Sequence, residues 1–311
     1  MDETVYWAHL AAVEGVGGAL IDELIKRFGS LKRAMEAPLD QVKEIPNLDA
    51  RTAEAVCRAA HTLPATRAKM AALAKLGLRV VIRLDNAYPP RLRQAFNPPP
   101  VIYLAGEFQP GDRRTVAIIG SRQCSDISAR RAREYAAELA RAGLTVVSGY
   151  APGVDEAAHR GTLEAGGRTI VVPGCGAERF DFTPLADQGV ASFADLAGRG
   201  VWLSEQPPEA GWSGQGSLAR NRLVAALAGV LLVIEAQTHS STLNTVERGI
   251  ALGRPVFVQD FATLTQRVMG NEALKREGAG IIRTAADLDQ VVAAAGDSDN
   301  GRPERTEDPR R

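Results

Sequence analysis

The triplet Gly120-Ser121-Arg122 combines residue types that suit binding of a phosphate group. It follows the apolar run Val116–Ile119, and we expect it to turn from a strand into a helix. The glycine permits a tight turn, N–H groups at the start of a helix attract anions, and the guanidinium adds planar donors with a permanent charge. The triplet matches neither the glycine pattern of dinucleotide-binding loops nor that of nucleoside-triphosphate-binding loops, so it predicts a phosphate contact of another kind.

A second cationic segment, Arg220-Asn221-Arg222, follows a stretch rich in glycine and serine (Gly211–Ser217). We expect it to lie on a loop and to open a helix over Leu223–Ala228. On a loop, the two arginines could straddle neighbouring phosphates of one nucleic-acid backbone. The alternative is that these arginines form ion pairs at the surface.

The segment from Ser148 to His159 runs from an expected strand through a glycine-containing loop into an expected helix. Ser148 and Gly149 are candidates for phosphate contact at the end of that strand. Asp155 and His159 are four residues apart on one helix face, where a carboxylate and an imidazole could act as an acid–base pair. No nucleophile or metal ligand accompanies them, so we favour supporting roles, with Asp155 as a helix cap and His159 as a brace for the loop. We assign no catalytic residue and no metal ligand.

Polar residues also follow the apolar run Val230–Ile234. Glu235 comes first, and we expect it to support the pocket. Ser240 and Ser241, which precede Thr242, stand where another helix is expected to start. Hydroxyl groups at such a position either cap the helix or bind phosphate oxygens, and both alternatives stay open.

Apolar runs alternate with amphipathic helical stretches after Arg113. This alternation predicts an extended Rossmann-like, doubly wound and mostly parallel sheet, with helices on both faces. Ligands bind at the carboxyl ends of the strands in such sheets, so we expect the segments above to meet at that edge. The runs are Val116–Ile119, Thr145–Ser148, Thr169–Val172, Val201–Ser204, Val230–Ile234 and Pro255–Val258.

We predict four successive segments along the chain. Residues 1–65 form a small all-α domain of the helix-hairpin-helix or SAM-like kind, whose glycine turn Gly15–Gly17 either brings N–H groups up to DNA or only joins two helices of a bundle. Residues 66–112 form a connector with strand-like pieces and prolines that packs on the sheet domain. Residues 113–295 form the Rossmann-like domain. Residues 296–311, of mixed charge and without apolar periodicity, form a disordered tail.

Composition sets limits on the function. The 37 Lys and Arg residues balance 37 Asp and Glu residues, so binding of nucleic acid would depend on a local cluster of arginines. The three cysteines are widely spaced and show no metal-binding pattern. No apolar run is long enough to span a membrane. Acidic residues stand at the N-terminus, where a secretory signal needs basic ones. We therefore expect a cytoplasmic protein with reduced thiols, no cofactor and no membrane partner.

Tyr150 and Phe180 are the aromatic residues that we expect to stack on bases.

Taken together, these segments resemble the DprA/Smf family, the DNA-processing proteins of bacterial transformation. The likeness covers roughly residues 1–291 and includes six motifs in the same order. It implies a protein that binds and protects single-stranded DNA, loads the RecA recombinase onto that DNA, forms a homodimer and is not an enzyme. It also implies that the two arginine segments line a basic pocket for the DNA backbone. The motifs are Gly120-Ser121-Arg122, Ser148–His159, Ser204-Glu205, Arg220-Asn221-Arg222, Glu235-Ala236 and Gly278-Ala279.

The sequence departs from the family pattern at several positions. Ser240-Ser241-Thr242 replaces a serine-glycine-serine, and the loop Pro173–Phe182 lacks a tyrosine-proline pair. Asp260-Phe261 replaces a proline-glycine and places a negative charge where it could weaken the pocket. The charged tail replaces the C-terminal winged-helix domain of many members. These differences suggest a divergent member of the family.

We considered two other functions for the same fold. The first is a phosphoribohydrolase of the lysine-decarboxylase-like group, which cleaves nucleoside monophosphates and carries the motif P-G-G-x-G-T-x-x-E. The matching segment here, His239–Glu247, keeps only the final glutamate and lacks the glycines that let the backbone close on a ribose phosphate. The second is a nucleotide sensor that uses the same pocket for a small signal.

Overall fold

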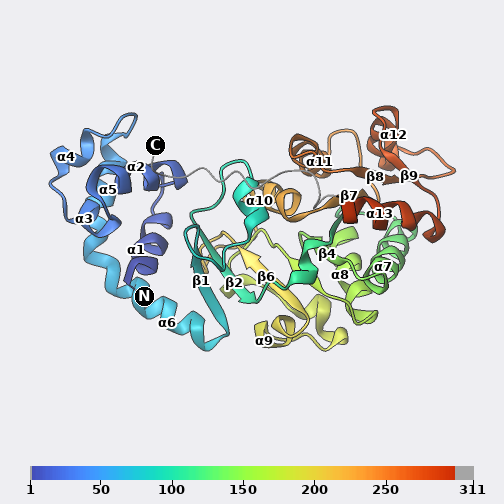
Figure 1. Ribbon diagram of the computed structural model, residues 1–311, viewed down its shortest axis with the longest axis horizontal. Coiled ribbons are helices and arrows are strands. Elements are labelled where there is room, and N and C mark those ends of the chain that lie inside the picture. The colour runs from blue at the N-terminus through green and yellow to red at the C-terminus, as the bar shows by residue number, and fades with distance from the viewer. Residues whose placement is uncertain (1, 298–311) are drawn as a thin grey trace. The chain divides into compact units, whose positions relative to one another are not determined.

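The computed structural model describes residues 2–297 (Figure 1). It divides into two compact units, one made of residues 1–108 and 170–226 and the other of residues 109–169 and 227–311. The chain passes between the units three times, so neither unit is a continuous stretch of sequence. Of the expected tail, residues 298–311 lie outside the described residues.

Helices form the N-terminal part of the first unit, as predicted. Their apolar faces surround a core that includes Trp7, Ile21 and Leu24, all fully buried. Gly29, in the left-handed region at φ 77°, ends the second helix, where a residue with a side chain would be strained. The helices are α1 (Asp2–Ala11), α2 (Gly18–Phe28), α3 (Leu31–Glu36), α4 (Leu39–Lys43), α5 (Ala50–Ala59) and α6 (Leu63–Lys75).

The rest of the first unit is built on strands. β1 (Leu78–Ile82) runs antiparallel to β2 (Val101–Gly106), which runs antiparallel to β6 (Gly200–Ser204). The strand-like pieces of the expected connector are therefore true strands of a sheet. Next to β6 lies β5 (Thr169–Val171), at which the chain crosses from one unit to the other. Helices α9 (Phe193–Ala197) and α10 (Gly214–Leu227) complete this unit.

The second unit has a parallel sheet in the order β4-β3-β7-β8-β9. The strand order reverses at β3, because β4 follows on one side of it and β7 lies on the other. Such a reversal leaves a crevice at the carboxyl ends of the strands. The strands are β3 (Thr115–Ile119), β4 (Thr145–Ser148), β7 (Val230–Val233), β8 (Val256–Gln259) and β9 (Gly280–Ile282).

Helices cover both faces of this parallel sheet, as the doubly wound prediction requires. Val116, Val230 and Leu232 share a core with α7 (Asp126–Arg141), α8 (Val154–Glu164) and α13 (Asp289–Asp297). Leu231 points to the opposite face, where Gly249 of α11 (Ser241–Ala251) packs against it. α12 (Met269–Arg276) connects β8 to β9. Among residues 2–297, no helix is long and apolar enough to cross a membrane.

Candidate nucleic-acid interface

Three loops of the second unit meet at the carboxyl end of β3. The backbone N–H of Ser121, after β3, donates to the carbonyl oxygen of Glu235, after β7, at 2.8 Å. The N–H of Val154, at the start of α8, donates to the carbonyl oxygen of Ser121 at 3.3 Å. A Cβ on Gly153 would lie 2.6 Å from the Ser121 oxygen and 2.7 Å from that of Arg122. The loops after β3, β4 and β7 thus form one contact cluster at the point where the strand order reverses.

Arg122 is exposed on the loop after β3. Its guanidinium has no ion pair and no hydrogen bond among residues 2–297, so its charge faces solvent. The expectation that the triplet sits at a helix N-terminus is wrong, because α7 begins only at Asp126, with Ser125 as its N-cap. Gly120 has a packing role, since a Cβ there would lie 2.6 Å from a methyl carbon of Val154.

Glu235 is a buried carboxylate, 1% exposed, that ties this loop to β7. Its Oε2 accepts hydrogen bonds from the N–H of Ser125 (3.0 Å), the hydroxyl of Ser125 (2.9 Å) and the hydroxyl of Ser128 (2.7 Å). Its Oε1 lies 3.8 Å from Nη1 of Arg267, which also donates to the carbonyl oxygen of Gln123. Sequence reasoning missed these partners, although a serine before a predicted helix is a signal for an N-cap.

The loop after β4 is fixed by buried side chains. Ser148 is fully buried, and its hydroxyl donates to the carbonyl oxygen of Ile118 at 2.6 Å. Asp155 accepts from the N–H of Gly149 (3.2 Å) and of Ala151 (3.5 Å), so it binds the loop before α8, whose N-cap is Gly153. The carboxylate therefore holds the loop rather than capping the helix.

Tyr150 of that loop and His159 of α8 form a buried pair. His159 is fully buried, and its Nδ1 lies 2.7 Å from the hydroxyl of Thr169. The ring of Tyr150 lies 5.7 Å from the imidazole and is 6% exposed. Phe180 belongs to the first unit and is 9% exposed. Its ring packs edge-on against Phe182 and Trp202 of the same unit. Neither aromatic ring offers a face to a base, so the expectation that Tyr150 and Phe180 stack on DNA is wrong.

Ser240 occupies the N-cap position of α11, but its side chain makes no capping hydrogen bond. Its Oγ is buried and has no hydrogen-bond partner in the described part of the chain. Ser241, the next residue, is exposed. The start of this helix therefore has a buried hydroxyl group whose hydrogen-bonding capacity is not used within residues 2–297.

Asn271, in α12, joins the ends of two strands and was not foreseen from the sequence. Its Nδ2 donates to the carbonyl oxygens of Ile234 and Gln259, both at 2.9 Å, and its Oδ1 accepts from the N–H of Ala236 at 2.8 Å. The side chain is 1% exposed. A single asparagine in a helix gives no periodic signal, so its role becomes visible only in the fold.

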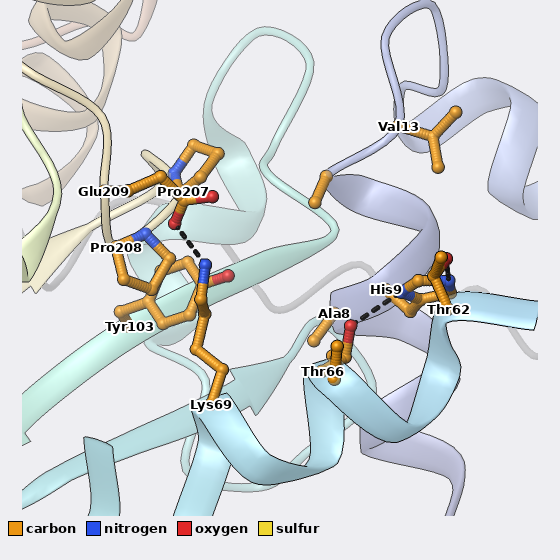
Figure 2. A pocket seen from close by; sticks show the side chains of 12 residues that line it. Ala8, His9, Val13, Thr62, Thr66, Lys69, Tyr103, Pro207, Pro208 and Glu209 are labelled. Carbon is orange, nitrogen blue, oxygen red and sulfur yellow. Dashed lines mark hydrogen bonds and ion pairs between the residues drawn. The ribbon is translucent and has the colours of Figure 1, made fainter. Parts of the chain in front are cut away.

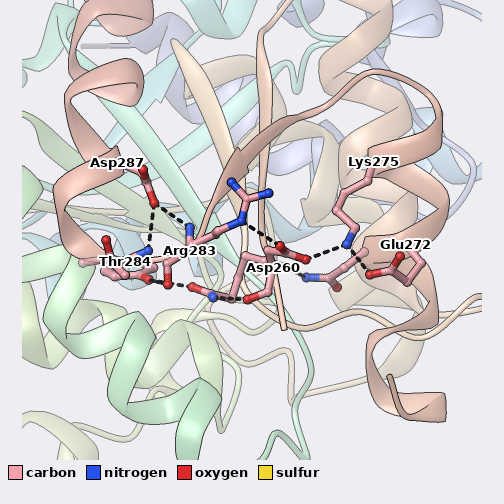
Figure 3. Close-up of polar contacts among 9 residues, drawn as sticks. Asp260, Glu272, Lys275, Arg283, Thr284 and Asp287 are labelled. Atoms are coloured by element: carbon pink, nitrogen blue, oxygen red, sulfur yellow. Dashed lines mark hydrogen bonds and ion pairs between the residues drawn. The ribbon is translucent and has the colours of Figure 1, made fainter. Parts of the chain in front are cut away.

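The negative charge at Asp260 is balanced within the second unit (Figure 3). Its Oδ1 accepts from Lys275 Nζ at 2.6 Å, and its Oδ2 lies 3.2 Å from Arg283 Nε. The hydrogen bond from Lys275, together with the charges of both cations, holds the pKa of Asp260 below its usual value despite partial burial. Replacement of the family's proline-glycine by Asp260-Phe261 therefore adds no uncompensated charge.

In the first unit, Arg220-Asn221-Arg222 lies in the middle of α10 and not on a loop. A helix advances 100° per residue, so Arg220 and Arg222 point in nearly opposite directions. The expected loop is helical from Gly214 onward, and Gly216 serves close packing there: a Cβ on Gly216 would lie 2.6 Å from the carbonyl oxygen of Gly174. Arg220 and Asn221 are each 5% exposed.

Arg222 is engaged by a carboxylate. Its Nη1 and Nη2 each lie 2.5 Å from an oxygen of Glu205, which fulfils the ion-pair alternative considered for this segment. Arg122 and Arg222 belong to different units, and their joint contact with one DNA backbone stays a prediction.

The first unit also contains a pocket of about 240 Å³, lined by α1, α6, Tyr103 and the segment 207–209 (Figure 2). Its polar groups are engaged with one another. Lys69 Nζ lies 2.8 Å from Glu209, and the ring nitrogens of His9 lie 2.7 Å from the hydroxyl of Thr66 and 2.6 Å from the carbonyl oxygen of Ala59. None of the residues predicted to bind DNA lines this pocket.

Comparison with known proteins relates the whole arrangement to one family. Residues 79–293 match the family of DNA recombination-mediator protein A. Protein Smf from Synechocystis is 30% identical over 302 residues, which cover 94% of this chain and 73% of that protein. DNA processing protein DprA from Streptococcus pneumoniae is 32% identical over 210 residues, 66% of this chain and 71% of that protein.

Two solved structures are similar to this one. The X-ray structure of DNA processing protein A from Streptococcus pneumoniae has a TM-score of 0.69 and 26% identity, covering 93% of this chain and 97% of that one. DNA processing protein A from Helicobacter pylori, whose structure addresses the single-stranded DNA binding mode of that protein, has a TM-score of 0.58 and 27% identity. That comparison covers 70% of this chain and 95% of the other.

Proposed function

The chain belongs to the DNA recombination-mediator protein A family, and on this premise we propose that it binds single-stranded DNA at the carboxyl edge of its parallel strands. The observation that carries the proposal is the exposed Arg122, which has no partner among residues 2–297 and stands on a loop held by Gly153 and Glu235. A cation held in place without a carboxylate suits an anionic ligand.

Arg122 and the serine hydroxyls of this unit suit a sugar-phosphate backbone better than a base edge. The hydroxyl of Ser240 lacks a partner in the described part of the chain, Ser121 stands on the loop after β3, and Ser241 is the first residue of α11. Contacts of this kind position a strand without reading its sequence. Because the chain as a whole is neutral, attraction of DNA depends on these few groups.

We assign the predicted residues two kinds of role. Those proposed to contact the strand are Gly120, Ser121, Arg122, Ser148, Gly149, Arg220, Asn221, Arg222, Ser240 and Ser241. Those proposed to support them are Asp155, His159 and Glu235. Buried members such as Ser148 and Arg220 would contribute through the backbone or by fixing their neighbours.

The test is a titration of a fluorescent single-stranded oligonucleotide at several salt concentrations. Arg122→Ala is expected to weaken binding to all sequences alike and to reduce the slope of log affinity against log salt by about 0.7, the value for one phosphate of a single strand. Arg130→Ala, which removes another exposed arginine of the same unit, is the matched control. A slope unchanged by Arg122→Ala would place the DNA elsewhere.

We further propose, from membership of the family, that the protein protects single strands, helps load the RecA recombinase in natural transformation and recombination, and acts in the cytoplasm as a homodimer. Co-sedimentation with RecA tests the first interaction, and measurement of the molar mass by light scattering tests whether two copies of the chain form a homodimer. We propose no enzymatic activity, and release of free adenine from AMP by the purified protein would contradict this.

A further inference from the structure

Phe96 is the most exposed large apolar side chain among residues 2–297, at 72%. It lies in the first unit, on the loop between the 3₁₀ helix η2 (Pro90–Gln94) and β2. A single exposed apolar residue on a mobile loop would need no explanation. Phe96 differs because the backbone that carries it is held from several sides.

Arg222 holds this loop directly. Its Nε donates to the carbonyl oxygens of Phe96 (3.1 Å) and Asn97 (3.2 Å), while its terminal nitrogens bind Glu205. The buried Tyr88 donates from its hydroxyl to the carbonyl oxygen of Pro99 at 2.9 Å. Asn97 adopts the left-handed conformation at φ 52°, and three prolines follow it. The ring of Phe96 is therefore presented on a fixed backbone, so little further ordering of that backbone would be needed when a partner binds.

Cations surround the base of the loop. The guanidinium carbon of Arg93 lies 5.5 Å from the centre of the Tyr88 ring. Burial raises the pKa of Tyr88, while the nearby charges of Arg83 and Arg222 oppose that rise. Arg83 is paired with Asp22 and Arg222 with Glu205. In the described part of the chain, Arg93 donates only to backbone carbonyl oxygens, of Arg83 and Asp85, so its guanidinium is not paired with a carboxylate.

An exposed aromatic ring on a loop that has arginines at its base suits single-stranded nucleic acid, because a base can stack on the ring and cations attract the phosphates. We propose that Phe96 is a base-stacking platform for single-stranded DNA, and that Arg222 is a positioning residue that holds this platform through the loop carbonyls. The proposal rests on the proposed function and supplies the aromatic contact that the buried Tyr150 and Phe180 do not provide.

The first test compares Phe96→Ala with Phe96→Trp in titrations of single-stranded oligonucleotides. Loss of the ring is expected to weaken binding about 5- to 150-fold, since stacking contributes about 1–3 kcal/mol per base. The slope against salt should stay unchanged, because the ring carries no charge. Phe96→Trp should keep the affinity. Leu76→Ala, which truncates another exposed apolar side chain of the same unit, is the matched control.

An oligonucleotide that lacks bases shows whether Phe96 contributes to affinity by stacking on a base or in another way. Wild type and Phe96→Ala should bind a fully abasic strand equally. Arg222→Lys keeps the charge but loses the planar fork that reaches Glu205 and both carbonyls. It is expected to weaken binding, and the double variant with Phe96→Ala should be no weaker than Phe96→Ala alone, because both changes remove one interaction.

Equal affinity of wild type and Phe96→Ala for normal single strands would overturn the proposal while leaving the proposed function intact. So would a loss that persists on the abasic strand, or a change in oligomeric mass for Phe96→Ala with DNA affinity unaltered, which would mark the ring as a contact between copies of the chain. Absence of any single-strand binding by the wild type would overturn the proposed function as well.

Discussion

Arg222 and Glu205 form a two-point ion pair, with both nitrogen–oxygen distances at 2.5 Å and side chains only 15% and 14% exposed. This parallel geometry is the strongest form of guanidinium–carboxylate contact. An arginine bound in this way contributes little net charge to its surroundings. Arg222 instead fixes the backbone of the loop at Phe96 and Asn97, whose carbonyl oxygens accept hydrogen bonds from its Nε.

Glu205→Gln is predicted to release the charge of Arg222. Single-strand affinity should rise at low salt, and the salt slope should steepen by up to about 0.7, because one further cation becomes available to phosphate. The free energy of unfolding should fall by about 1–3 kcal/mol, since the guanidinium loses a charged hydrogen-bond partner. Salt titrations and denaturant unfolding measure the two effects. Glu178→Gln, which removes an exposed carboxylate of the same unit, should change neither the salt slope nor the free energy of unfolding. A salt slope unchanged in Glu205→Gln would show that DNA does not approach Arg222.

Gly153→Ala is predicted to impair DNA binding as well as stability. Gly153 has φ 88°, so any side chain is strained, and its Cβ would press on the carbonyl oxygens of Ser121 and Arg122. Gly166→Ala is a matched control, because Gly166 has φ 70° but nothing within 4 Å of a Cβ. Gly166→Ala should lose about 1 kcal/mol of unfolding free energy, and Gly153→Ala should lose more because its Cβ also meets two carbonyl oxygens. Only Gly153→Ala should weaken single-strand binding, and equal affinity of the two variants would contradict a role for the Arg122 loop.

The central strands could be predicted from the sequence because both of their faces are buried. Val116–Ile119 and Thr145–Ser148 therefore read as continuous apolar or small-residue runs, and the structure has strands there. β9 was missed because Gly280–Ile282 is too short for any periodic signal. The antiparallel pairing of β1 and β2 was missed because prolines between them suggested an irregular connector.

The errors at the site have a common physical cause. Gly216 suggested a loop, whereas its missing side chain lets α10 pack against Gly174. Residue type indicated that Arg222 could bind phosphate, but only the fold brings Glu205, 17 residues earlier in the sequence, against it. Exposure is also a property of the fold, and for that reason Phe96 could not be separated from Tyr150 or Phe180 beforehand.

Glu235→Gln is predicted to loosen the loop after β3. The carboxylate is buried and accepts three hydrogen bonds from Ser125 and Ser128, so loss of its charge should lower the free energy of unfolding by about 1.5–3 kcal/mol. Ser128→Ala removes one of these donors and should cost less. The double variant should be less destabilised than the sum of the two single variants, because they share one interaction. Additive losses in a denaturant-based double-mutant cycle would contradict this coupling.

Asp260→Asn is predicted to make stability less dependent on acid pH. The folded pKa of Asp260 lies below its ordinary value of 3.8, chiefly because of the hydrogen bond from Lys275. A depressed pKa contributes stability above the unfolded value, and that contribution is lost as the pH falls through the folded value. The pKa of Lys275 is raised above 10.5 by Asp260 and Glu272, so its contribution is complete below 10.5 and is lost at higher pH. The free energy of unfolding of the wild type should therefore exceed that of Asp260→Asn by an almost constant margin between about pH 5 and pH 10.

The margin should be about 1–2 kcal/mol, as expected for hydrogen bonds to a charged group in a half-buried site. It should shrink steadily below about pH 4, because both proteins then carry a neutral side chain at this position. Denaturant unfolding at a series of pH values measures it. Glu277→Gln, an exposed carboxyl-to-amide change just after α12, should leave the profile parallel to that of the wild type. If the margin between wild type and Asp260→Asn stayed the same down to pH 2, the ion pair with Lys275 would not be the source of the stability.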